Sequence, residues 1–132
     1  MLWMNIAALL TSALLFGGMM LYSFGFAPLV FSSLPSDVAG KLLRKAFPHY
    51  YAFVLLTAGL AAALLWQSNS LSSGLMAATA VMAIIARQML MPAINMARDM
   101  GAKSRFNRLH GLSVALNMVQ LAAVVAVLVR MA

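Results

Sequence analysis

The stretch FSSLPSDVAGKLLRKAFPHYY, residues 31–51, interrupts a strongly apolar sequence with three of its nine basic residues. The chain has 132 residues, of which 64% are hydrophobic and only 8% are charged. A water-soluble domain carries about 25% charged residues, because its surface must remain hydrated. The outer surface of this protein is therefore predicted to face lipid, and the polar stretch is predicted to connect two segments that cross a bilayer.

Residues 35–46 of this stretch have the pattern of an amphipathic helix. On a helical wheel, the apolar side chains occupy one continuous arc, and the other arc holds Lys41, Arg44 and Lys45. This helix is too short to span a membrane, so it is predicted to lie in the interface with its basic face toward lipid headgroups. We expect it to end at Pro48, where the second crossing begins. The alternative is a lid over a site on the same side of the membrane.

Four segments reach the length of about 20 mostly apolar residues that a transmembrane helix needs. They cover about residues 2–31, 48–66, 75–91 and 109–130. The predicted fold is an all-α integral membrane protein. It forms a single domain over residues 1–132, a four-transmembrane-helix bundle with the short interfacial helix between helices 1 and 2. The first segment is longer than the hydrocarbon core is thick, so it is expected to tilt or to bend at Pro28.

The basic residues are distributed unevenly between the two sides of the predicted membrane. Eight of them lie in or beside the first and third connections, and only Arg130 lies on the side of the termini. Because basic residues in short loops stay cytoplasmic, both termini are predicted to lie on the non-cytoplasmic side. Membrane orientation thus explains the net charge of +7, and nucleic acid is not a predicted partner. The sequence has no cysteine, which excludes disulfides and thiolate ligands.

The segment FNRLHGLSVALNMVQ, residues 106–120, carries a polar stripe on an otherwise apolar helix. Spacings of three, four and three place its members on one face: His110, Ser113, Asn117 and Gln120. Amide side chains find no hydrogen-bond partner in hydrocarbon, so this face is predicted to point into the bundle. Two interpretations remain open. The stripe either bonds to neighbouring helices or lines a small polar cavity.

Further polar side chains are expected at the depth of His110. His49 and Tyr50 begin the second crossing on the same side of the membrane. Arg87, in the third crossing, either points inward or extends to the interface. The candidate ligand-binding residues are therefore His110, Ser113, Asn117, Gln120, His49, Tyr50 and Arg87. No cofactor or metal is predicted; the alternative is a haem or copper site formed by His49 and His110.

Two groups of residues form motifs at the basic connections. The first comprises Leu34-Pro35, Gly40, Phe47-Pro48 and Tyr50, and the second is Phe106-x-Arg108-x-His110-Gly111-Leu112-Ser113-x-x-x-Asn117. Ala86-Arg87 and Pro92 give a looser match in the third helix. Over about residues 17–117, the chain resembles transmembrane protein 205 and its bacterial relatives, a family filed as domain of unknown function 4149. The resemblance implies a four-helix integral membrane protein without a settled activity, here in a bacterial inner membrane.

These features favour a non-enzymatic bundle that binds a small or lipid-like ligand or serves as a subunit of a membrane assembly. Its predicted partners are the lipid bilayer and either further copies of itself or a larger complex. No catalytic residue is predicted, because Ser113 and His110 have no acid placed to orient the imidazole. A haem- or copper-binding redox protein is the alternative. A transporter is less favoured, because the sequence shows no paired broken helices.

Overall fold

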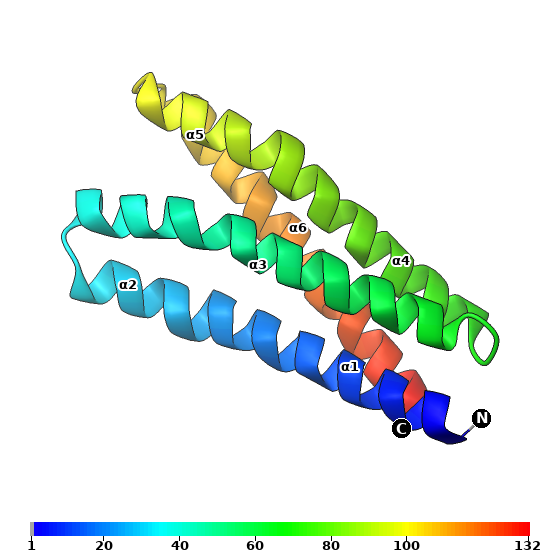
Figure 1. Cartoon of the computed structure of the whole chain (residues 1–132). Coiled ribbons are helices and arrows are strands. Elements are labelled where there is room, and N and C mark those ends of the chain that lie inside the picture. The colour runs from blue at the N-terminus through cyan, green and yellow to red at the C-terminus, as the bar shows by residue number, and fades with distance from the viewer. Residues whose placement is uncertain (1) are drawn as a thin grey trace.

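The computed structural model describes residues 2–132, and these form helices joined by short turns (Figure 1). The elements are α1 (Leu2–Met20), the π-helical segment η1 (Leu21–Phe26), α2 (Ala27–Ser33), α3 (Ser36–Leu65), α4 (Ser70–Ile85), the π-helical segment η2 (Ala86–Leu90), α5 (Met91–Asp99) and α6 (Lys103–Met131). Over residues 2–132 they make four continuous helices, each long and apolar enough to cross a membrane. The predicted four-helix membrane bundle is thereby confirmed.

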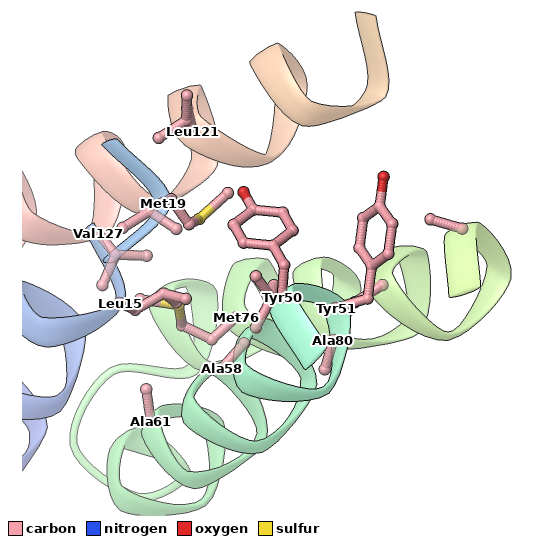
Figure 2. Close-up of a cluster of buried hydrophobic side chains, with 14 of the residues drawn as sticks. Leu15, Met19, Tyr50, Tyr51, Ala58, Ala61, Met76, Ala80, Leu121 and Val127 are labelled. Atoms are coloured by element: carbon pink, nitrogen blue, oxygen red, sulfur yellow. The ribbon is translucent and has the colours of Figure 1, made fainter. Parts of the chain in front are cut away.

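The bundle has an up-down-up-down arrangement. α3 packs between α1 and α4, and α6 packs against both α4 and α1, which closes the bundle. Figure 2 shows part of the core, in which large side chains of α1 and α6 share one buried cluster with the small residues Ala58, Ala61 and Ala80. Lipid tails are as apolar as leucine, so helix association in a membrane depends on close van der Waals packing. The alanines permit that close approach.

The turns divide the bundle into two chemically different ends (Figure 1). The α2–α3 turn and the α5–α6 turn lie at one end, and the chain termini lie with the α3–α4 turn at the other. We call the first the basic end, since it carries Lys41, Arg44, Lys45, Arg98, Lys103, Arg105 and Arg108. The distribution of charge along the sequence thus corresponds to a distribution in space.

The predicted boundary between an interfacial helix at residues 35–46 and a second crossing at 48–66 is wrong. α3 runs without a break from Ser36 to Leu65 and contains Pro48 in its interior. Its first turns do not lie apart from the bundle, because Ala39 and Leu43 are buried against Val30 of α2. An interior proline removes one helical hydrogen bond, but transmembrane helices tolerate it where neighbouring groups compensate. Part of the apolar arc of residues 35–46, at Ala39 and Leu43, therefore faces protein, whereas Val38 and Leu42 of the same arc are exposed. Whether the basic arc contacts headgroups stays a prediction.

Two of the four long helices contain a π-helical segment followed at once by a proline. η1 precedes Pro28, and η2 precedes Pro92, with each proline at the start of the α-helix that follows. A proline cannot donate to the preceding turn, and a π-type turn is one way in which a helix accommodates that loss. The first long helix is thus interrupted near Pro28, where a tilt or bend was expected, and the third is interrupted near Pro92. Both occur in the half of the bundle that is nearer the basic end.

The tight α5–α6 turn depends on Gly101, whose φ is +67°. The Ala102 amide donates to the Ala97 carbonyl at 2.9 Å, and the Gly101 amide donates to the Arg98 carbonyl at 3.1 Å. These two bonds form a Schellman motif, which requires the left-handed conformation that glycine adopts without strain. The turn brings the last residues of α5 to the basic end.

Arg130 forms hydrogen bonds between helices at the end of the bundle that holds the chain termini. Its Nη2 donates to Asn69 Oδ1 at 3.2 Å and its Nε donates to Ser72 Oγ at 3.3 Å. Asn69 is the N-cap of α4, since its Oδ1 also accepts from the Ser72 amide at 3.1 Å. The one basic residue on the side of the termini therefore ties α6 to the start of α4.

Candidate functional site

A polar network joins three helices inside the bundle. The Tyr50 hydroxyl donates to Asn117 Oδ1 at 2.7 Å, and Asn117 Nδ2 donates to Ser23 Oγ at 2.9 Å. Tyr50 comes from α3, Asn117 from the stripe on α6, and Ser23 from η1. Figure 2 shows the rings of Tyr50 and Tyr51 side by side, with both hydroxyls pointing away from α3. Asn117 thus uses both ends of its amide to hold α6 against two other helices.

Gln120 is the most deeply buried member of the stripe. Its side chain is 1% exposed, and its Nε2 donates to the Thr79 carbonyl of α4 at 3.0 Å. Its Oε1 has no hydrogen-bond partner among residues 2–132. For Gln120 the structure therefore gives the first interpretation of the stripe, a bond to a neighbouring helix.

The other end of the stripe borders a cavity of about 490 Å³ at the basic end. The two helical pairs α2–α3 and α5–α6 each pack together there, and the cavity lies between the pairs. Its volume is in the range typical of small-molecule sites, about 300–1,000 Å³. His110, Ser113 and Asn117 line it from α6. The stripe therefore changes role along its length, from interhelical bonding at Gln120 to cavity lining at His110.

The cavity has a charged rim at the basic end. Arg44 of α3 forms a bidentate ion pair with Asp99 at the end of α5, with N–O distances of 2.9 and 3.0 Å. Both side chains are exposed and screened by solvent, so the pair contributes little to stability. It nevertheless connects the two helical pairs across the cavity. Arg98, one residue earlier, also lines the cavity, with its guanidinium against Gly40.

A second, apolar rim separates η1 and α2 from α6. Phe24 and Phe31 line it from the first long helix, and Val114 and Met118 line it from α6, and all four are exposed. In a membrane this rim would face the acyl chains. The cavity thus combines an apolar opening with a positively charged one.

The two histidines do not share this site. His110 lines the cavity and stacks on Phe106, with ring centroids 5.8 Å apart and planes 4° apart. His49 is exposed and is not among the cavity-lining residues. Over residues 2–132, no three His, Cys, Asp or Glu side chains gather as a metal-ion set. This arrangement gives the haem or copper alternative no paired histidine ligands, and that alternative stays a prediction.

Arg87 was expected either to point into the bundle or to extend to the interface, and in the structure it does neither fully. It is exposed, and its Nε donates to the Pro48 carbonyl at 3.1 Å. It borders a smaller hollow of about 250 Å³, which shares Met91 and Asn95 with the main cavity. The π-helical segment η2 places Arg87 beside the proline that α3 accommodates. Its contact is therefore with the backbone of α3.

Three groups at the site were not among the predicted residues. Ser23 is a single polar residue within an apolar run, and Tyr51 follows the predicted Tyr50. The third group is the rim of Asn95, Arg98 and Asp99. A 3.6-residue periodicity continued beyond Pro92 places Asn95 and Asp99 on one face of the third helix, but they were not among the candidate site residues. Of the predicted headgroup residues, Arg44 contacts Asp99, while Lys41 and Lys45 are exposed away from the cavity lining.

Comparison of the sequence with family models shows which family the chain belongs to. The family described as Domain of unknown function (DUF4149) matches residues 10–103. The matched range includes the first motif, at Leu34 to Tyr50, and Ala86 to Pro92, whereas the motif at residues 106–117 lies beyond it. Neither the curated proteins nor the solved structures include a match to the chain. Since the matched residues are well over half of the sequence, this integral membrane protein belongs to the family of domain of unknown function 4149.

Proposed function

We propose that this protein is a non-enzymatic membrane protein that binds a lipid-like ligand in the cavity at the basic end. One observation carries the proposal: a cavity of about 490 Å³ has an apolar rim toward the surrounding membrane and a polar rim of arginine and histidine. Ligand sites are typically concave, mostly apolar and supplied with a few convergent polar groups. A lipid has the same two parts: its acyl chains match the apolar rim, and its headgroup matches the polar rim.

The proposal includes a location and an orientation. The protein would be a bacterial inner-membrane relative of transmembrane protein 205, with both termini outside the cytoplasm. Clustering of basic side chains at one end supports this orientation, because such residues are retained on the cytoplasmic side. The cavity would then open to the inner leaflet. Assembly with further copies or with other membrane proteins stays a prediction.

Filling the cavity is expected to remove a bound lipid. Ser113→Trp places a large ring where Ser113 lines the cavity, so we expect native mass spectrometry to detect at least several-fold less retained lipid than in the unmodified protein. Val119→Trp is the matched control, because Val119 is on the same helix, 57% exposed and outside the cavity lining. Circular dichroism and gel filtration in detergent check that each variant is folded. Ser113→Leu replaces Ser113→Trp if the larger side chain prevents folding.

The proposed function is contradicted if the unmodified protein retains no lipid, or if Ser113→Trp and Val119→Trp retain equal amounts. Either result would mean that any bound lipid lies on the outer surface of the bundle rather than between its helices.

A further inference from the structure

We propose that the cavity selects a phospholipid with an anionic headgroup, and that Arg98 binds the headgroup phosphate. This inference rests on the proposed function, since it concerns which lipid enters the same cavity. It is derived from the position of Arg98, from the charges around it and from the direction in which the cavity opens.

Gly40 allows Arg98 to reach across the cavity. A Cβ atom placed on Gly40 would overlap the Arg98 guanidinium, so only glycine leaves room for this contact. Arg98 belongs to α5 and Gly40 to α3, which form opposite walls of the cavity. By contrast, among the residues described, a Cβ placed on Gly59 of the same helix would have no atom of a neighbouring helix within 4 Å. The absence of a side chain at position 40 therefore leaves the space beside α3 in which the Arg98 guanidinium lies.

Arg98 is the rim arginine whose charge is left unbalanced. The whole sequence has two acidic side chains, Asp37 and Asp99. Asp99 directs both carboxylate oxygens to Arg44, and among residues 2–132 Arg98 has neither a salt bridge nor a side-chain hydrogen bond. Two arginines and one aspartate leave the rim with a net charge of +1. A guanidinium has five donors in a planar fork that fits phosphate oxygens, so an anionic headgroup complements it.

Two further side chains near Arg98 can donate hydrogen bonds to an anionic headgroup. Asn95 on α5, the helix of Arg98, and His110 on α6 also line the cavity, and both carry N–H donors. The apolar rim at Phe24 and Met118 lies deeper along the helices, toward the middle of the predicted membrane. A phospholipid of the leaflet at the basic end could enter without inverting, with its phosphate at Arg98 and an acyl chain between η1 and α6.

The test measures which lipid is retained. Protein in vesicles of equal phosphatidylethanolamine and phosphatidylglycerol is extracted in mild detergent, and the retained lipids are quantified by mass spectrometry. We expect about tenfold enrichment of phosphatidylglycerol over the vesicle composition, because both lipids present a phosphate to Arg98 but only phosphatidylethanolamine adds an ammonium group, which a rim of net charge +1 repels. Arg98→Gln should reduce this enrichment to nearly one while some lipid is still retained. Arg105→Gln is the matched control, because it removes the same charge at the same end outside the cavity lining.

A second pair of variants tests the position of Arg98 without changing charge. Gly40→Ala should displace the guanidinium and lower the enrichment several-fold, whereas Gly59→Ala should leave it unchanged. Retention of lipid without enrichment in the unmodified protein would overturn this inference and leave the proposed function standing. Equal losses in Arg98→Gln and Arg105→Gln would overturn it too, because the preference would then come from general surface charge. Absence of any retained lipid would overturn both proposals.

Discussion

Asn117→Leu is expected to lower the free energy of unfolding by about 2–3 kcal/mol. The substitution removes the bonds of Asn117 to Tyr50 and Ser23, at 2.7 and 2.9 Å. Each such bond in a membrane contributes about 0.6 kcal/mol, with a maximum of about 1.7 kcal/mol. The larger part of the cost comes from the Tyr50 hydroxyl, which loses its acceptor while its side chain remains 2% exposed.

Equilibrium unfolding in mixed detergent micelles measures this effect. Val119→Leu, on the lipid-facing side of the same helix, is the control and should change stability by less than about 0.5 kcal/mol. Tyr50→Phe combined with Asn117→Leu should recover part of the loss, because the unsatisfied hydroxyl is then absent. Ser23 Oγ lies 3.5 Å from the Tyr50 hydroxyl. If it moves closer in the variant, it accepts the Tyr50 hydrogen bond and reduces the loss of stability. An Asn117→Leu protein as stable as Val119→Leu would show that the network does not hold α6 in place.

Gly18→Leu is expected to destabilise the bundle by about 1–3 kcal/mol, the usual cost of overpacking a well-packed site. A Cβ on Gly18 would lie 2.5 Å from the ring of Phe53 in α3, so the leucine must displace that ring. Within residues 2–132, a Cβ placed on the neighbouring Gly17 would have no atom of another helix within 4 Å. Gly17→Leu therefore makes a matched control in the same helix.

The same unfolding experiment measures the difference between the two glycines. Gly17→Leu should be nearly neutral, and Phe53→Ala should partly compensate Gly18→Leu because it vacates the space that the leucine needs. If the two leucine variants were equally stable, α1 and α3 would not pack along the line of Gly18 and Phe53.

The four helices could be predicted from the sequence because hydrophobic length and the spacing of polar residues are local properties. The direction of the polar stripe follows for the same reason, since Gln120 has no partner in hydrocarbon and must turn inward. The partner of each stripe residue depends on the rotation of a different helix. Ser23, a lone serine within an apolar run, gave no periodic signal that it would meet Asn117.

The continuity of α3 could not be predicted from local rules, which favour a helix end before Pro48. Burial of Ala39 and Leu43 against α2 instead favours one uninterrupted helix, and this is a tertiary effect. The Arg44–Asp99 pair joins residues 55 positions apart, so it depends on how far the helical pairs separate at the basic end. The pairing of Arg44 with Asp99 at the rim of the cavity could therefore not be predicted from sequence patterns.

Entry of lipid between the helices can be measured directly, because the sequence has no cysteine and any single introduced thiol is unique. Three leucines of α3 can each be changed to cysteine in vesicles that contain a phospholipid with a maleimide on its headgroup. Leu43 lines the cavity and is 6% exposed, Leu42 beside it is 40% exposed, and Leu65 is in the core near the opposite end and 2% exposed. Mass spectrometry then records the rate at which lipid becomes attached.

We expect Leu43→Cys to react at a rate within about tenfold of Leu42→Cys, while Leu65→Cys stays unmodified, because a lipid headgroup enters the cavity but not the core. Labelling of all three variants after denaturation verifies that each thiol is free. If Leu43→Cys reacted no faster than Leu65→Cys, headgroups would not reach the space beside Arg98 and His110, and the cavity would not be a lipid site.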